Sequence, residues 1–418
     1  MRRYFLLLFA GCALACGGQP HEAKGAHDAP KTANEVEVPR TVVTPTDASS
    51  IPELLADAKA LSDAQRWSDA AAAYDRIYKL QPEGPTGEEA AWGAAFAYDH
   101  ARNFEPAVAR YALYIKRDPD SHRGHQAMVY ASSLLVFLGR YAEAGVYAER
   151  LLKNASDLSN IERIATLSAR ALALTDRGED QQASYFIEKA RNIVEDQQLD
   201  RAGQVPPNLA QLYYALGETR RLKAERISFQ PVPPNFGAVL EQRCQLLLDA
   251  QSAYSDATRA YDPHWSAMAG YRIAELYQRL HEDLMAVKPP PSADEERKRQ
   301  LWQGAVLTRY SVLLSKAKGM AQQTLAMAER TGERSEWVDR TRQALQAIEK
   351  AMAEEETALS QLPYSRADFE AYIAEQEAAA AAPPGPTSPV SGKAPPASKG
   401  PAATPGKAQV PKKGPRNP

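Results

Sequence analysis

The sequence predicts an all-α protein built as a solenoid of helical hairpins. Small residues recur every 37 positions, at Ala70, Ala107 and Ala144. In the first two copies an aromatic residue follows four positions later and a proline eight positions after that: Tyr74, Tyr111, Pro82 and Pro119. Apolar residues around these points recur at offsets of three and four, which places them on one face of a helix. A fixed period in the thirties is typical of helical repeats.

Residues 51–199 contain four copies of the predicted hairpin. The expected core positions of the four copies, in order, are Leu54, Ala58, Leu61, Ala70, Tyr74 and Ile77; Ala91, Ala94, Ala95, Tyr98, Ala107, Tyr111 and Tyr114; Met128, Ser132, Leu135, Ala144, Ala148 and Leu151; Leu167, Ala171, Leu174, Ala183, Ile187 and Ala190. We expect the small residues where two helices cross closely and the tyrosines in the space beside them. Pro82 should end the second helix, because proline has no N–H to donate.

The segment from Gly139 to Ala144, of sequence GRYAEA, closely resembles the inter-helix turn of the tetratricopeptide repeat (TPR). The alanine, tyrosine and proline offsets resemble the second half of the same repeat, and together the matches cover about a third of the chain. The chain departs from the family in its period of 37 rather than 34 residues. It also has Leu54, Ala91 and Met128 at the first-helix position where the family usually carries a tryptophan.

The resemblance implies that the first helices of successive repeats line a groove that binds protein partners. Carried onto this sequence, the groove positions are Trp92, Phe96, Asp99, Val129, Ser133 and Val136. An exposed tryptophan beside a phenylalanine would suit an aromatic-anchored peptide site. The alternative is that the rings of Trp92 and Phe96 pack against the neighbouring repeat.

Residues 205–377 predict longer helices. Their expected ranges are Leu209 to Ile227, Phe236 to Tyr261, His264 to Val287, Ala293 to about Arg330, and a last helix that carries Trp337 to Leu362. Apolar residues of the fourth alternate at spacings of four and three, as in a heptad pattern. The short break at Thr331–Glu333 predicts an antiparallel hairpin of the last two. We expect this hairpin to cap the solenoid, because a terminal repeat must cover its apolar face.

Residues 1–16 predict an export signal. Arg2 and Arg3 precede a short apolar stretch, and small residues then lead to a cysteine, an order that resembles a bacterial lipoprotein signal. Cleavage before Cys16 would leave Cys244 as the only free thiol, so Cys16 is the expected lipid attachment site and Cys12 the alternative. An ordinary secretory signal is the other interpretation.

The residues after Cys16 indicate which membrane would hold the lipid and how the folded part would be connected to it. Gly17 and Gly18 follow it and no aspartate does, which by the same resemblance implies the outer membrane, with the protein on its periplasmic side. Residues 17–50 are rich in Gly, Pro, Asp, Thr and Ser and predict a flexible tether.

Residues 378–418 predict a disordered basic tail. The segment consists largely of Ala, Pro, Gly, Ser and Lys and contains no acidic residue. Its basic residues are Lys393, Lys399, Lys407, Lys412, Lys413 and Arg416. The tail is either a solubilising segment or a weak electrostatic contact for cell wall or another anionic surface.

No motif predicts catalysis, a metal site or a cofactor. His122 and His125 could share a helix face as metal ligands, but a solvated helix start is the simpler interpretation. The serine–lysine spacing of Ser315 and Lys318 has no companion motif in the chain. Cys244 lies among leucines and indicates a small buried side chain. A net charge of −2 and a pI of about 6.4 argue against a general nucleic-acid binder.

We therefore expect a non-enzymatic, lipid-anchored scaffold that binds other envelope proteins in an outer-membrane assembly, motility or secretion complex. One alternative is an accessory factor that holds a peptidoglycan synthase or hydrolase. A catalytic site hidden in the helices of residues 205–362 is the third possibility.

Overall fold

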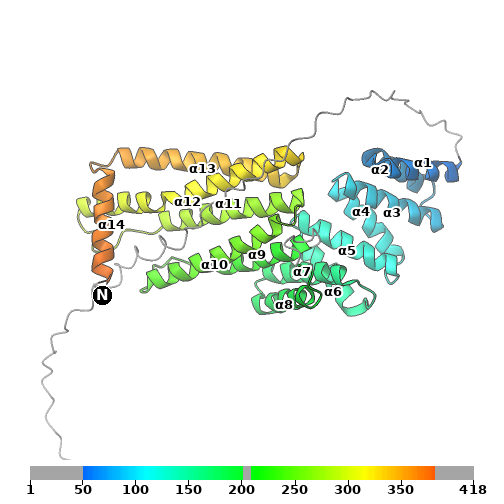
Figure 1. Ribbon diagram of the computed structural model, residues 1–418, viewed down its shortest axis with the longest axis horizontal. Coiled ribbons are helices and arrows are strands. Elements are labelled where there is room, and N and C mark those ends of the chain that lie inside the picture. Colours follow the sequence, from blue (N-terminus) through cyan, green and yellow to red (C-terminus); the bar gives the residue numbers. More distant parts are fainter. Residues whose placement is uncertain (1–49, 201–208, 382–418) are drawn as a thin grey trace, which may run out of the picture. The chain divides into compact units, whose positions relative to one another are not determined.

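The computed structural model describes residues 50–200 and 209–381 (Figure 1). All regular structure in these two ranges is α-helical, which confirms the predicted fold class. The expected export signal with Cys12 and Cys16, the tether before Ser50 and the basic tail after Ala381 lie outside the described residues.

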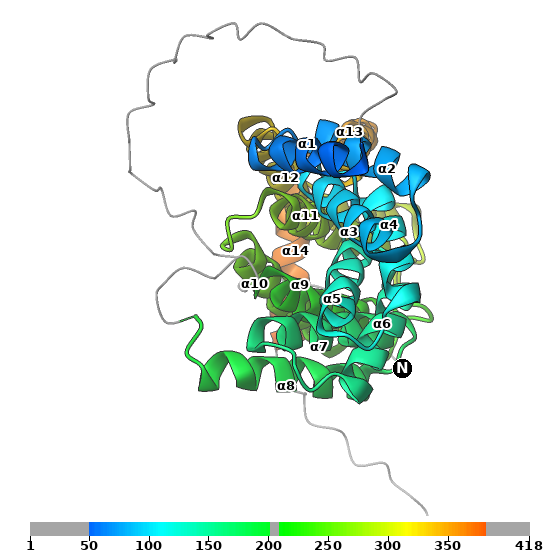
Figure 2. The same ribbon diagram turned by 90° about the vertical axis from the view of Figure 1, so that its right-hand side faces the viewer.

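Eight helices form the four predicted hairpins of a TPR-type α-solenoid. Their bounds are α1 Ile51–Asp63, α2 Trp67–Leu80, α3 Gly84–His100, α4 Phe104–Arg117, α5 His122–Phe137, α6 Tyr141–Asn154, α7 Asn160–Asp176 and α8 Asp180–Asp196. Each second helix packs against the first helix of its own pair and against the first helix of the next pair. In Figure 2 the first helices α1, α3, α5 and α7 follow one another from top to bottom.

The turn of every hairpin contains one residue with a left-handed backbone. The φ angle is 56° at Gln65, 57° at Arg102, 71° at Gly139 and 80° at Gly178. A left-handed residue just after a helix ends it and lets the chain reverse within a few residues. Gln65, Arg102 and Gly139 are 37 residues apart, as the repeat alanines are, so the same turn geometry recurs in each of the first three hairpins.

The predicted small and aromatic positions form the core of the hairpins. Ala70, Ala107 and Ala144 are fully buried, and Tyr111 is buried with them. The ring of Tyr74 crosses from α2 to α3 at Gly93, where a Cβ would lie 2.5 Å from a ring carbon. The close helix crossing therefore depends on small residues on both sides of the contact.

Six helices follow the solenoid. They are α9 Ala210–Glu225, α10 Phe236–Thr258, α11 Pro263–Met285, α12 Glu296–Thr331, α13 Glu336–Ser360 and α14 Arg366–Ala381. The pair α12 and α13 forms the predicted hairpin, whose turn contains Gly332 at a φ of 74°. Helix α14 was not expected as a separate element. It is attached through Phe369, whose buried ring covers Gly304 of α12 at a point where a Cβ would lie 2.1 Å away.

The hairpin turn lies against the third repeat, which the expectation of a terminal cap did not foresee. The indole N–H of Trp337 bonds the carbonyl oxygen of Phe137 at the end of α5. Beside it, His264 at the start of α11 bonds Glu333 of the turn. The long helices therefore return to the middle of the solenoid as well as extending it.

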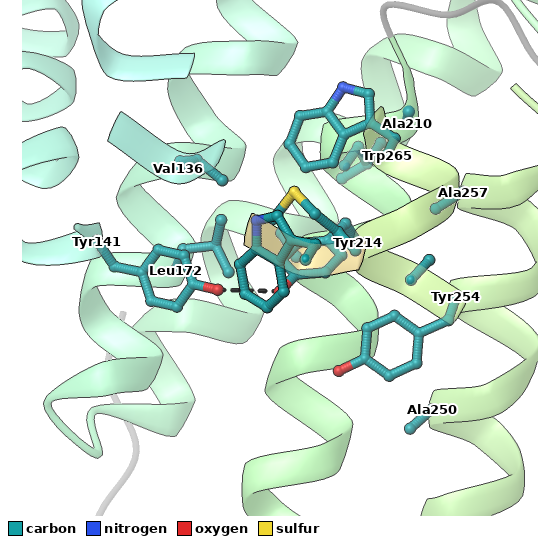
Figure 3. Close-up of a cluster of buried hydrophobic side chains, with 14 of the residues drawn as sticks. Val136, Tyr141, Leu172, Ala210, Tyr214, Ala250, Tyr254, Ala257 and Trp265 are labelled. Carbon is teal, nitrogen blue, oxygen red and sulfur yellow. Dashed lines mark hydrogen bonds between the residues drawn. The ribbon is translucent and has the colours of Figure 1, made fainter. Parts of the chain in front are cut away.

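The core runs without a break from the second repeat into the long helices. Figure 3 shows Val136 of α5 and Leu172 of α7 beside Tyr214 of α9 and Trp265 of α11. The hydroxyl groups of Tyr141 and Tyr214 lie 3.0 Å apart in the same cluster. A second, separate core joins α1, α2 and one side of α3.

Charged groups are also buried where α9, α10 and α11 meet. The Glu218 carboxylate accepts hydrogen bonds from Arg221 Nη2 at 2.8 Å and from the Tyr254 hydroxyl at 2.5 Å, and Arg272 Nε lies 2.9 Å away. Burial by itself would raise the pKa of Glu218, but the guanidinium groups of Arg272 and Arg221 outweigh this and lower the pKa to about 2. The network therefore holds an ionised carboxylate inside the protein.

Candidate functional site

The first-helix face is the surface formed by Phe96 and Asp99 on α3 and by Tyr130 and Ser133 on α5. Phe96 and Tyr130 are exposed, at 37% and 38%, although both are large apolar side chains. Asp99, three residues after Phe96, and Ser133, three residues after Tyr130, are half-buried. Partly exposed aromatic rings together with a carboxylate can supply an apolar anchor and a polar contact, which makes this surface a candidate binding site.

Trp92 lies under this face rather than on it. Its ring packs edge-on against Tyr111 and Tyr114 of α4, at centroid distances of 5.8 and 5.5 Å. The ring of Tyr130 on α5 is tilted against it at 6.2 Å. The guanidinium group of Arg123 lies 4.7 Å from the ring. Most neighbours of the Trp92 ring therefore belong to adjacent helices, as expected if the ring packs against the neighbouring repeat.

Phe96 belongs to an aromatic group at the edge of the face. Its centroid lies 5.9 Å from that of Trp67 at the start of α2 and 4.0 Å from that of His100. The side chains of Trp67 and His100 leave part of the Phe96 ring open. Phe96 therefore packs against the neighbouring repeat on one side and is open to a partner on the other.

The groove positions expected on α5 differ in their exposure. Ser133 is half-buried, but Val129 and Val136 are buried, at 5% and 0% exposure, so neither valine is open to a partner in this structure. The reason is that α5 packs against α4, α6 and α7 and also contacts α11, so it is covered from several directions. Tyr130, which the repeat offset missed by one position, occupies the open side instead.

Asp99 is set apart by its electrostatic surroundings. Burial raises the pKa of its carboxyl, the charges of His100 and Arg102 lower it, and Asp262 raises it further. Among the described residues no hydrogen bond or ion pair satisfies this carboxylate. A partly desolvated carboxylate without a partner is costly to a folded protein, which makes Asp99 a candidate binding residue.

A cavity of about 480 Å³ lies next to this region, where the α3–α4 turn meets the α12–α13 turn. His264 lines it and is almost fully buried between Phe104 and Phe137, at ring distances of 4.9 and 4.2 Å. Its Nδ1 atom lies 3.0 Å from Glu333 Oε1. Sequence reasoning did not connect these residues, because Phe104 and Phe137 precede His264 by more than 120 residues and Glu333 follows it by 69.

The other candidate residues have structural partners. His122 and His125 both contact the Asp157 carboxylate through Nδ1 at 2.7 Å, which joins the third repeat to the α6–α7 connection. Ser315 donates to the Ser311 carbonyl, and Lys318 pairs with Glu349. Within residues 50–200 and 209–381, no group of three His, Cys, Asp or Glu side chains is arranged to hold a metal ion. In the same ranges, no helix has the length and hydropathy needed to span a membrane.

No known family model matches the chain, and no curated protein matches it. Among solved structures, the human IFIT1 dimer with m7Gppp-AAAA aligns at 14% identity and a TM-score of 0.38, covering 79% of this chain and 72% of that one. A monomeric IFIT1 mutant with the same ligand aligns at 15% identity and a TM-score of 0.40, covering 79% and 71%. Yeast Tom70 aligns at 11% identity and a TM-score of 0.24, covering 79% and 95%. The helix pairing of the chain itself, described above, is what establishes its fold.

Proposed function

We propose that this protein is a binding scaffold that holds an extended segment of a partner protein on the first-helix face. The observation that carries the proposal is the exposure of Phe96 and Tyr130 beside the half-buried, unpaired Asp99. Large rings and a charge that are left open on a rigid helical surface supply an apolar anchor and a specific polar contact. Stacked repeats keep such a surface rigid, because each helix is fixed by its neighbours on both sides.

We further propose that the scaffold works in the cell envelope, anchored by lipid at Cys16 on the periplasmic side of the outer membrane. The support is the order of the N-terminal residues: two arginines, an apolar stretch, small residues and a cysteine. Acyl chains would supply the membrane attachment. A Cys16→Ser variant should leave the membrane fraction, whereas Cys12→Ser should remain in it. Equal fractionation of both variants with the wild type would contradict the assignment of Cys16.

Site-specific photo-crosslinking in intact cells tests the binding proposal. A benzoylphenylalanine at position 96 or 130 should capture one partner of the same mass, and the purified partner should then bind the purified protein. The matched control is position 185, where Tyr185 of α8 is 51% exposed and lies outside the first-helix face. Capture from position 185 with equal yield, or no capture from 96 and 130, would contradict the proposal.

Trp92→Ala separates packing from recognition. Because the Trp92 ring fills space between α3, α4 and α5, its removal should lower the thermal midpoint. Phe96→Ala should weaken partner binding with a smaller loss of stability, since part of that ring is already exposed. If Phe96→Ala leaves affinity unchanged, the first-helix face is not the contact surface.

A further inference from the structure

The cavity between the α3–α4 turn and the α12–α13 turn is lined by both exposed and buried residues. Asn103 and Arg334 in its lining are exposed, whereas Phe104, His264 and Trp337 are buried. Its volume of about 480 Å³ lies within the range of about 300–1,000 Å³ that is typical of ligand pockets. The cavity is therefore large enough for a side chain of a partner and connects the surface with buried groups.

The buried part of the lining contains polar atoms without partners. His264 is 2% exposed, and its Nδ1 atom lies 3.0 Å from Glu333 Oε1. Its other nitrogen, Nε2, makes no hydrogen bond with any described residue, and neither do Glu333 Oε2 and Ser335 Oγ. All three residues line the cavity. Buried polar atoms are nearly always bonded, so three unsatisfied ones around a single cavity indicate a missing partner.

The charges in the lining are already balanced. Apart from the exposed Arg334, its acidic residues and its other arginine are held in ion pairs: Arg102 with Glu333 at 3.2 Å, Glu105 with Arg140 at 2.9 Å and Glu336 with Arg340 at 2.6 Å. An ion that entered the buried part would lose its hydration, and the groups there that could neutralise it are already paired. The cavity is therefore suited to a neutral occupant.

A hydroxyl group fits the unsatisfied atoms in either protonation state of His264. It can donate a hydrogen bond to Nε2 when that nitrogen carries no proton and accept one when it does. An indole N–H can only donate and a carbonyl oxygen can only accept, so each fits one state alone. A hydroxyl that bonds Nε2 also keeps capacity for a second bond, to Glu333 Oε2 or Ser335 Oγ.

The apolar part of the lining favours an aromatic ring beside that hydroxyl. The rings of Phe104 and Phe137 lie 4.9 and 4.2 Å from the His264 ring, centroid to centroid, and Leu138 and Trp337 also line the cavity. A further ring can meet such neighbours in the edge-on and offset arrangements that aromatic pairs prefer. The side chain of a serine or threonine would leave most of the volume empty.

We propose that this cavity binds a tyrosine side chain of the partner, with its hydroxyl group toward His264 Nε2. The tyrosine belongs to the segment that the first-helix face holds, because Ala101 and Arg102 in the cavity lining follow Asp99 of that face by two and three residues. This inference rests on the proposed function, because it names a side chain of the partner that binds there.

p-Cresol, which has the shape of the tyrosine side chain, tests the cavity in the full-length protein. Labelling with 5-fluorotryptophan gives a ¹⁹F NMR signal for each tryptophan, and the signal that Trp337→Phe lacks belongs to the lining residue. We expect p-cresol to shift this signal saturably. Toluene, which lacks the hydroxyl group, should bind about tenfold more weakly, the loss that corresponds to one hydrogen bond.

His264→Phe assigns the hydroxyl contact. This variant keeps a ring and removes Nε2, so p-cresol should lose its advantage over toluene. The matched control is His122→Phe, since the His122 side chain is 63% exposed and lies outside the cavity lining, and it should keep the tenfold difference. A tenfold difference that persists in His264→Phe would overturn the inference. So would equal binding of p-cresol and toluene to the wild type, or binding of neither, which would indicate a cavity that holds water only; these results depend on no variant.

Crosslinking connects the cavity to the partner. Benzoylphenylalanine at position 103, on the exposed part of the lining, should capture the same partner as position 96, through a segment that contains a tyrosine. Replacing that tyrosine with phenylalanine should weaken binding about tenfold to the wild type and little to His264→Phe. Capture from position 96 but not from 103, or equal affinity of the two partner segments, would overturn this inference alone. No capture from 96 and 130 would instead contradict the proposed function.

Discussion

The indole Nε1 of Trp337 donates a hydrogen bond of 2.8 Å to the main-chain carbonyl oxygen of Phe137, which lies 200 residues earlier in the chain. Phe137 is the last residue of α5, so its carbonyl has no partner within that helix. Trp337 is the second residue of α13. One bond between a side chain and a helix end therefore joins the hairpin turn to the third repeat.

Trp337→Phe should destabilise the protein. The smaller phenyl ring would keep only part of the packing, and the part-buried carbonyl of Phe137 would lose its donor, at a cost of about 1–3 kcal/mol. Urea unfolding followed by circular dichroism measures this loss. The matched control is Trp302→Phe, since the Trp302 Nε1 atom is buried without a hydrogen bond to any described residue. Equal losses for the two variants would show that the bond contributes nothing specific.

Gln65→Gly should stabilise the first hairpin. Gln65 is exposed and has a φ of 56°, a left-handed backbone that costs about 1 kcal/mol for a residue with a Cβ. Part of this gain is offset by the greater freedom of glycine in the unfolded chain, so we expect about 0.5 kcal/mol. Gly139→Ala, at the same place in the third hairpin and with open space around its Cβ, should change stability in the opposite direction. Thermal midpoints of both variants test the pair.

Glu218→Gln should destabilise the long-helix region and alter its response to acid. The change leaves the buried guanidinium groups of Arg221 and Arg272 without their shared carboxylate, which costs about 3–5 kcal/mol for a broken buried pair. Since the pKa of Glu218 is lowered from 4.5 to about 2 on folding, its contribution is complete above about pH 4.5. It is lost as the pH falls from there toward 2.

The urea midpoint as a function of pH measures this effect. The wild type should lose stability between pH 4.5 and 2 more steeply than Glu218→Gln does. Glu188→Gln, at an exposed position of α8, is the control and should follow the wild-type curve. Parallel curves for wild type and Glu218→Gln would mean that the carboxylate is not held ionised by the network.

Gly145→Ala should disturb the contact between the third and fourth repeats, because the new methyl group would lie 2.3 Å from the Cβ of Ala173 on α7. Overpacking of this kind costs about 1–3 kcal/mol. Ala173→Gly in the same chain should restore much of the loss, since it removes the opposing methyl group. Gly319→Ala, where a Cβ meets nothing within 4 Å, should instead be neutral or stabilising. Differential scanning calorimetry of the four proteins checks the series.

The repeat region could be predicted from the sequence because each of its contacts is local. Ala70, Ala107 and Tyr111 meet neighbours from the same or the next hairpin, so a period of 37 residues contains the information. The long helices were predicted for the same reason, from their apolar spacing and from prolines at their ends. Helix α14 was missed because it is held chiefly through Phe369, whose contact on Gly304 is 65 residues away.

The candidate site could be predicted only in part. The repeat offset selected Phe96, which is exposed, and Asp99 and Ser133, which are half-buried, and their role in binding stays a prediction. It also selected Val129 and Val136, which are buried in a helix that packs against α4, α6, α7 and α11. Tyr130 was one position from the offset, and its exposure depends on how α5 is covered. The position of His264 beside Phe137 could not be predicted, because the contact joins α11 to α5 across more than 120 residues and no repeat in the sequence indicates it.

That return changes how the molecule should come apart. In a linear array each repeat contacts only its neighbours, so a terminal repeat can unfold independently of the others. Here the contact between Phe137 and Trp337 closes a loop through the long helices, and the stretch between them should open as one cooperative unit. The pair α1 and α2, with its own small core, lies outside that loop. Amide hydrogen exchange should therefore be fastest in α1 and α2 and slow together across α5 and α11.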